Sequence, residues 1–293
     1  MQPTQRKLQM QERVAHAGSF RLLQVSDALS KVNRRLYRQG RNYRVKLQLP
    51  QAINGASVEV YALQDTWVNK LAWCKAMETY MNATKAEREM LGPRVARWHD
   101  FRVQYGSNAA FVGGVMDYAP LVKSPSLSDV LLTEGEFNNS TIQLDGADGT
   151  ANDKGFWWDG TTATNFGLLA ELQKLFNTDD APTVIEVNQP YDGLKNEQMS
   201  LDDFKELQDE GNEPPYDATT FDNPWIRVDT LEIAGGDGLR ETDWFNAPCG
   251  LILIKGATAN NLTLHVASGD YKGVHAPPMG VAKLTNDKVY KVR

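Results

Sequence analysis

The stretch that decides the fold is FNAPCGLILIKGATANNLTLHVASGDYKGVHAPPM, residues 245–279. It contains two apolar runs, Gly250–Lys255 and Leu262–Val266, separated by the polar, turn-forming residues 256–261. Apolar and polar side chains alternate along the second run, which is the period of a strand with one face on a core. The two runs predict an antiparallel hairpin. Pro277–Pro278 cannot continue a hydrogen-bonded ladder, so we expect the sheet to end before them.

Runs of the same kind occur along the rest of the chain. Most of them alternate apolar and polar residues, and the first convincing strand begins at Arg41. The expected strands are Arg41–Leu49, Ser57–Leu63, Phe101–Tyr105, Phe111–Tyr118, Asp129–Leu132, Thr141–Leu144, Thr183–Val187 and Ile226–Ile233.

Helical periodicity is confined to the connections between these strands. The expected helices are Asp27–Arg38 with Ser26 as N-cap, Thr66–Asn82 with Asp65 as cap, and Asn165–Phe176. Because strands and helices do not alternate regularly, a parallel βαβ sheet is disfavoured. The pattern predicts a mainly β fold, a single antiparallel jelly-roll sandwich with long loops and two or three inserted helices.

Two connections are unusually long for a compact domain. Residues 119–160 contain only short strand-like pieces, and residues 197–217 carry eight acids and one lysine. Long loops without secondary structure are uncommon in a lone domain. We therefore expect these loops to be buried between copies of the chain in a large closed homo-oligomer.

Composition bounds the class of protein. A chain of 293 residues, 41 % hydrophobic and 23 % charged, can form a sizeable core. It has no apolar run of the roughly 20 residues that span a bilayer, and its N-terminus lacks the apolar region of a secretory signal. Cys74 and Cys249 lie in apolar surroundings and are interpreted as buried thiols rather than a disulfide. These features favour an intracellular product in a reducing compartment.

The net charge of −6 conceals an asymmetry. The first fifty residues contain eleven Lys and Arg against Glu12 and Asp27, a net charge of +9, so the rest of the chain carries −15. We divide the chain into a basic N-terminal arm with an amphipathic helix, residues 1–40, and a jelly-roll domain, residues 41–293. This charge layout is expected when one end meets nucleic acid or another polyanion. The other interpretation is a solvated segment that pairs with the protein's own acidic surface.

Catalytic and metal-binding signatures do not occur in the sequence. It has no phosphate-binding glycine loop, zinc-protease, serine-hydrolase or paired-cysteine motif, and its four histidines are scattered. Asp145, Asp148 and Asp153 lack the spacing of an EF-hand loop. A carboxylate pair for glycoside hydrolysis stays open because acids are plentiful. We expect no catalytic site, no metal and no cofactor, and we do not expect an enzyme.

An apolar cluster, Phe156, Trp157 and Trp158, stands beside Asp159–Gly160. Such a cluster can form a stacking platform for sugars or bases. More often it packs under a loop or fills a subunit interface. These three residues and Tyr271 are our candidates for contacts between subunits.

Several features together resemble a known family. They are the basic arm Arg6–Lys46, the strand that leaves it directly, about eight short strands and the closing segment 245–279. This combination is similar to the single jelly-roll capsid proteins of small circular single-stranded DNA viruses that encode a replication-initiator protein. In that family the arm lines the shell interior and binds the genome, while long loops build the outer surface and the symmetry contacts.

The resemblance implies a viral capsid protein that self-assembles into an icosahedral shell. It would be found in the virion and, during assembly, in the nucleus or cytoplasm of the host cell, with a host-cell receptor as a further candidate partner. Its contacts with packaged single-stranded DNA would be to phosphates and independent of base sequence. The residues concerned are Arg6, Lys7, Arg13, Lys31, Arg34, Arg35, Arg38, Arg41, Arg44 and Lys46.

Two other interpretations stay open. One is a carbohydrate-binding, lectin-like jelly roll that uses the aromatic cluster as its platform. The other is a phage or virion accessory protein with a similar fold.

Overall fold

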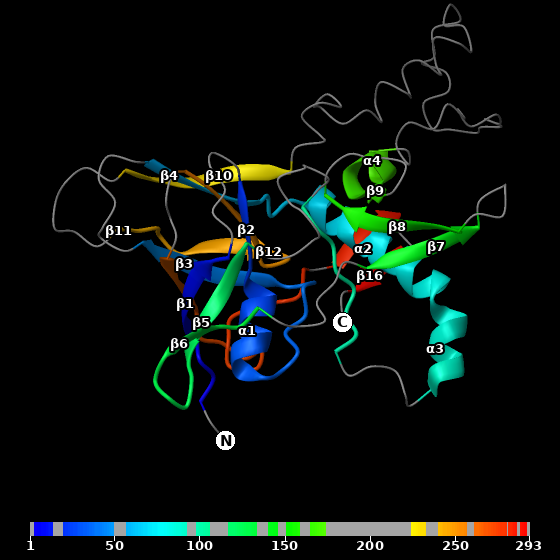
Figure 1. Cartoon of the computed structure of the whole chain (residues 1–293). Helices are drawn as coiled ribbons and strands as arrows, with labels where there is room; N and C mark the ends of the chain where they lie inside the picture. Colours follow the sequence, from blue (N-terminus) through cyan, green and yellow to red (C-terminus); the bar gives the residue numbers. More distant parts are fainter. Residues whose placement is uncertain are drawn as a thin grey trace, which may run out of the picture.

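The computed structural model of the chain is mainly β, and its two largest sheets are antiparallel (Figure 1). Within the residues that it describes, no helix is long and apolar enough to cross a membrane. The described residues are 3–13, 20–49, 57–92, 98–105, 117–133, 140–145, 151–158, 165–173, 224–232, 240–256, 261–279, 281–285 and 288–291. The expected strand Thr183–Val187, most of Phe111–Tyr118 and the acidic stretch 197–217 lie outside them.

The larger sheet, sheet A, has seven strands in the order β11-β3-β14-β1-β5-β6, and β12 also pairs with β3. The bounds are β1 Lys7–Glu12, β3 Asn42–Leu49, β5 Tyr118–Lys123, β6 Asp129–Leu131, β11 Arg240–Glu241, β12 Phe245–Pro248 and β14 Asn261–Val266. β1 lies between β14 and β5, with Leu8 opposite Leu264 and Met10 opposite Pro120. Strands from the two ends of the chain are therefore neighbours.

The smaller sheet, sheet B, has the order β10-β4-β13-β2, and every pair in it is antiparallel. The bounds are β2 Arg21–Gln24, β4 Ser57–Leu63, β10 Trp225–Glu232 and β13 Leu251–Lys255. Ile252 and Ile254 of β13 belong to one core, whereas Leu251 and Leu253 belong to a second core. A strand with both faces buried needs apolar residues at every position, which explains the continuous run LILI.

The first core fills the space between the two sheets. It combines inward side chains of sheet A, such as Val45 and Leu264, with those of sheet B, such as Val60, and with Leu29 of helix α1, Val25–Asn33. All of these side chains are almost completely buried. The two sheets thus form a β-sandwich, whose layers are visible on the left of Figure 1.

The second core covers the other face of sheet B and belongs mostly to the long connection between β4 and β10. This connection contains α2 Trp67–Ala83, α3 Lys85–Leu91, α4 Leu168–Gln173 and the three-stranded sheet β7 Thr141–Asp145, β8 Ala151–Trp157 and β9 Asn165–Gly167. A C-terminal pair, β15 Val281–Thr285 and β16 Lys288–Lys291, contacts α2. Trp73, Phe101, Phe156 and Trp158 are buried in this core. Figure 1 shows these elements on one side of the sandwich.

The predicted hairpin of residues 245–279 is wrong. Both of its strands form, but β13 pairs with β2 and β4 in sheet B, while β14 pairs with β1 and β3 in sheet A. The chain passes from one sheet to the other between them. Each strand finds partners that bury its own apolar side chains, which pairing with each other would not provide.

The predicted start of the β-structure at Arg41 is also wrong. β1 and β2 precede it, one in each sheet, and most of α1 is buried in the first core. The helix begins at Val25 and ends at Asn33, and Gln24 rather than Ser26 is its N-cap. Much of the expected basic arm therefore lies within the sandwich itself.

Other predicted elements agree with the structure. The strands expected at Arg41–Leu49, Ser57–Leu63, Asp129–Leu132, Thr141–Leu144 and Ile226–Ile233 are confirmed as β3, β4, β6, β7 and β10. The long helix is confirmed as α2, although Thr66 is its cap and its hydroxyl accepts a hydrogen bond from Asn69 N at 3.4 Å.

Two predicted elements need correction. Residues 101–105 form no strand and make only an isolated bridge from Gln104 to Trp157. The helix expected from Asn165 begins only at Leu168, because residues 165–167 form β9 beside β8.

Candidate nucleic-acid interface

In sheet A the strands β1, β3 and β14 alternate between buried and more exposed side chains, which gives this part of the sheet one apolar and one polar face. In β1, β3 and β14 the inward side chains are buried, and the side chains between them are exposed or half-buried. The outward residues are Lys7, Gln9, Gln11, Arg44, Lys46, Gln48, Asn261, Thr263 and His265. These nine residues, which we call the outer face, include three cations and no acid.

Three residues of the outer face form a row across the strands. Lys7 is opposite His265, and His265 is opposite Lys46, so their side chains are cross-strand neighbours. Partial burial and the two flanking ammonium groups lower the pKa of His265, while Glu241 has the opposite effect. These effects favour the neutral imidazole, whose Nε2 lies 2.9 Å from Gln48 Oε1.

Lys46 also forms an ion pair with Glu241 of β11. The lysine side chain is 20 % exposed and the glutamate side chain 43 % exposed. Partly exposed pairs of this kind contribute less than about 1 kcal/mol. A phosphate group can therefore replace the carboxylate at little cost.

A hollow of about 310 Å³ adjoins the row. Its polar lining comes from Gln9, Gln48, Asn261 and Thr263. Their amide and hydroxyl groups supply uncharged hydrogen-bond donors and acceptors next to the lysines. The outer face thus combines positive charge with uncharged hydrogen-bonding groups.

A second group of cations lies in the loop that follows α1. Arg34 ends the helix in the left-handed conformation, with φ 52°. The loop is then joined to a turn more than 200 residues later in the chain. Arg38 N donates to the Tyr271 hydroxyl at 3.1 Å, and Lys272 Nζ donates to Leu36 O at 2.5 Å.

Arg41 completes this arrangement. Its guanidinium carbon lies 3.4 Å above the centre of the Tyr271 ring, a cation–π contact, and Nη1 donates to Ala276 O at 2.8 Å. Burial lowers the pKa of Lys272, and the charges of Arg38, Arg41 and Arg35 lower it further. We call Arg35, Arg38, Arg41 and Lys272 the loop cluster.

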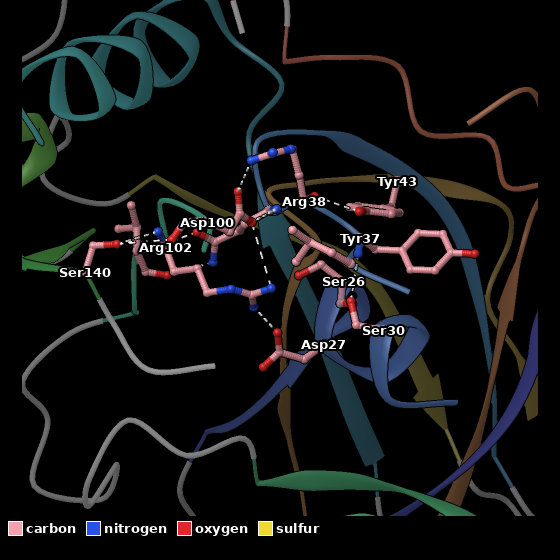
Figure 2. Close-up of polar contacts among 12 residues, drawn as sticks. Ser26, Asp27, Ser30, Tyr37, Arg38, Tyr43, Asp100, Arg102 and Ser140 are labelled. Carbon is pink, nitrogen blue, oxygen red and sulfur yellow. Dashed lines mark hydrogen bonds and ion pairs between the residues drawn. The ribbon is translucent and has the colours of Figure 1, made fainter. Parts of the chain in front are cut away.

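Asp100 is a carboxylate beside Arg38 of the loop cluster (Figure 2). Arg38 Nη1 donates to its Oδ1 at 3.1 Å, and Gln39 N donates to its Oδ2 at 2.9 Å. The Gln39 side chain also exchanges hydrogen bonds of 2.8 and 2.6 Å with the backbone of Val103. The segment 98–105 is thereby fastened to the loop that carries the cations.

Arg102 extends this network below the surface. It pairs with Asp27 of α1, and its Nη2 lies 3.8 Å from Asp100 Oδ2. Burial raises the pKa of Asp100 to about 6 and lowers that of Arg102 to about 9, so desolvation outweighs the neighbouring opposite charges. Arg102 is still charged at neutral pH. The outermost member, Arg38, has a side chain that is 45 % exposed.

The other predicted phosphate-binding residues are placed as follows. Arg6 is exposed, and its Nη1 is 3.5 Å from Gly273 O, close to the loop cluster. Arg34 is exposed at the end of α1. Arg13 and Lys31 are half-buried, and burial and the charge of Arg13 lower the pKa of Lys31. The structure thus gathers most of the predicted cations into the outer face and the loop cluster.

The aromatic candidates do not form a common surface. Phe156 is 3 % exposed and Trp158 1 % exposed, and both belong to the second core. Trp157 is half-buried, as is Tyr271, which lies under Arg41. This cluster therefore does not form a platform of three exposed rings, because two of the rings are buried in the second core.

Three residues of the site were not predicted. Sequence analysis selected none of His265, Lys272 and Asp100 as a site residue. A sequence signal existed for Lys272, because it lies in the turn-forming segment GDYKG. Asp100 had no signal, since its role depends on partners 61 and 62 positions away in the chain.

The described residues contain no group of three His, Cys, Asp or Glu that could hold a metal ion. Asp153 lies on β8, while Asp148 is outside the described residues. Cys74 and Cys249 are buried thiols and form no disulfide, as predicted. Burial raises the pKa of the Cys249 thiol, and the neighbouring Cys74 and Asp100 raise it further. The chain matches no protein-family model, no curated protein and no solved structure.

Proposed function

We propose that this chain is a capsid protein of the single jelly-roll class, which assembles into a closed icosahedral shell and packages single-stranded DNA. The observation that carries the proposal is the strand order. In a jelly roll, eight strands numbered along the chain fall into two sheets of order 1-8-3-6 and 2-7-4-5. Counting β1, β2, β3, β4, β10, β12, β13 and β14 in that way, the neighbours β1-β14-β3-β12 correspond to the first order and β2-β13-β4-β10 to the second, which supports the proposal; β5, β6 and β11 are additional strands of sheet A.

The long connection between the fourth and fifth of these strands fits the same proposal. It adds β5 and β6 to the edge of sheet A beside β1, and it adds its own helices and a small sheet beside the sandwich. Insertions of this kind are tolerated because they extend a loop without disturbing the ladders. In a shell they are the elements available for contacts between subunits.

The charge distribution supports nucleic acid as the packaged partner. The outer face and the loop cluster together hold most of the cations that sequence analysis selected, on a chain with a net charge of −6. Phosphate contacts of this kind are electrostatic and release counterions, so their strength falls with salt. A shell would bring many copies of the same basic surface together around one genome.

The assembly can be tested on purified full-length protein. We expect electron micrographs to show closed particles of uniform diameter and light scattering to give a large, monodisperse species. The particles should carry nucleic acid, seen as a raised ratio of absorbance at 260 nm to that at 280 nm. A monodisperse monomer across salt and pH would contradict the proposal.

The outer face can be tested separately by salt dependence. The double variant Lys7→Gln, Lys46→Gln removes two phosphate contacts, each with a slope of about −0.7 in log K against log salt for single strands. Its slope for single-stranded DNA should therefore be shallower than that of the wild type by about 1.4. Lys70→Gln, Lys85→Gln is the matched control, because both lysines are partly or well exposed on the helices α2 and α3 rather than on sheet A. Equal slopes for the test variant and wild type would exclude the outer face.

The carbohydrate-binding alternative has less support. Its stacking platform required Phe156, Trp157 and Trp158 to be exposed together, and two of the three are buried in the second core. Binding of the purified protein on a glycan array, without particle formation, would favour it over the capsid proposal.

A further inference from the structure

A cavity of about 370 Å³ opens beside Arg41 at the end of the sandwich. Its lining includes Arg41, Asp270, Tyr271, His275, Pro277 and Pro278. The volume is sufficient for one nucleobase with part of its sugar. The lining combines flat groups with one carboxylate.

The walls of the cavity are fixed before any ligand binds. Arg41 is held on both sides, by the Tyr271 ring at 3.4 Å and by Ala276 O at 2.8 Å. The proline wall is tied to β3, because Asn42 N donates to Pro277 O at 2.9 Å and Arg41 forms a β-bridge with Pro278. Pre-ordered walls reduce the entropy that binding would otherwise cost.

The flat groups are suited to an unpaired base. Proteins bind single strands by stacking bases on aromatic rings and on arginine guanidinium planes. Here a guanidinium is already stacked on a tyrosine, so a base can extend the stack or pack against the prolines. The loop cluster beside the cavity, with Lys272 and Arg38, supplies positive charge for the phosphates on either side of that base.

Asp270 gives the cavity a preference among bases. It is exposed, and within the described part of the chain it has no hydrogen-bond or ion-pair partner. A carboxylate accepts two parallel hydrogen bonds from N1–H and the N2 amino group of guanine. Adenine presents no such pair of adjacent donors on its Watson–Crick edge, and the pyrimidines present only one donor there.

We propose that the cavity beside Arg41 is a base-binding subsite that takes one unpaired nucleotide and prefers guanine, with Asp270 as the residue that selects it. This inference rests on the proposed packaging of single-stranded DNA and adds base selection to otherwise sequence-independent phosphate contacts. The Arg41 guanidinium, which is stacked on the Tyr271 ring, provides the stacking surface. Arg38 and Lys272 hold the adjoining phosphate.

The test uses short fluorescent oligothymidylate strands with one central guanine or one central adenine, and polarisation measured at low salt on the full chain. A bidentate contact corresponds to roughly tenfold or greater discrimination, so we expect the guanine strand to bind about ten times more tightly. Asp270→Asn should reduce that ratio to about two, since the amide cannot accept both bonds. Asp129→Asn, an exposed change on the distant β6, should keep the wild-type ratio.

Arg41→Met removes the stacked guanidinium and should weaken both strands several-fold, with a smaller guanine preference than wild type. Equal binding of the two strands by wild type, or an unchanged preference in Asp270→Asn, would overturn the subsite. These results test the subsite independently of the proposed function, because particle formation is measured separately by microscopy on the same preparations. Particles without a guanine preference defeat only this inference, and a guanine preference without particles supports the subsite while defeating the shell.

Discussion

Asp100→Asn should change how the stability of this protein depends on pH. The Asp100 side chain is 5 % exposed and its pKa is raised by burial from 3.8 to about 6. Between these two values the folded state retains a proton that the unfolded chain has lost. The free energy of unfolding therefore falls as pH rises, and the stabilisation that is complete below about pH 4 is lost as pH passes through about 6.

The magnitude follows from the two pKa values. One pKa unit corresponds to about 1.4 kcal/mol, so the full effect is about 3 kcal/mol. Between pH 5 and pH 8 the free energy of unfolding contributed by Asp100 changes by only about 1.4 kcal/mol, because the unfolded carboxyl is already ionised at pH 5. Asparagine has the same shape and can still accept the hydrogen bond from Gln39 N, but it does not titrate.

The assay is urea denaturation of wild type and Asp100→Asn at both pH values, under conditions where light scattering shows one species. The free energy of unfolding of the wild type, minus that of the variant, should be smaller at pH 8 than at pH 5 by about 1.4 kcal/mol. The lowered pKa values of His99 and His265 act in the opposite direction, but they are common to both proteins and cancel in the difference. Parallel pH profiles for the two proteins would refute the assignment of this effect to Asp100.

Two further predictions concern the packing of segments that sequence analysis placed differently. Leu8→Ala should lower the free energy of unfolding by about 2–5 kcal/mol, because Leu8 is 3 % exposed in β1. The adjacent outward change Gln9→Ala should alter the free energy of unfolding by less than about 0.5 kcal/mol. Similar losses for the two variants would contradict the placement of β1 in sheet A. Trp158→Ala should lower the free energy of unfolding, measured by urea denaturation, by about 3–5 kcal/mol, and Trp157→Ala should lower it clearly less. The reverse order would mean that Trp157 is the buried ring.

Local pattern was sufficient for many strands of the sandwich. β3 and β4 each bury every second residue, and this alternation is visible in the order of apolar and polar residues along the sequence. β1 alternates in the same way, but its polar residues and its position near the N-terminus favoured an unstructured arm. β2 is four residues long and completely buried, so it has no alternation from which a strand could be predicted.

The composition of the candidate site was partly predictable for a similar reason. Arg44 and Lys46 are outward residues of an alternating strand, and that placement needs no knowledge of the fold. The meeting of Arg38 and Arg41 with Lys272 required the turn at 271–273 to reach the loop after α1. Nothing within the sequence of either segment predicts that the two segments lie side by side.

By itself, the sequence determined several strands, such as β3 and β4, which of their faces is apolar, and where positive charge is concentrated. Each of these properties depends on residues that are neighbours in the chain or two to four positions apart. Only the tertiary structure decided that β13 and β14 belong to different sheets and that Phe156 and Trp158 are interior. The physical reason is that the backbone groups of every strand are chemically alike, so a strand's hydrogen bonds do not specify its partner. The partner is selected by which arrangement buries all the apolar faces at once, and that is a property of the whole chain.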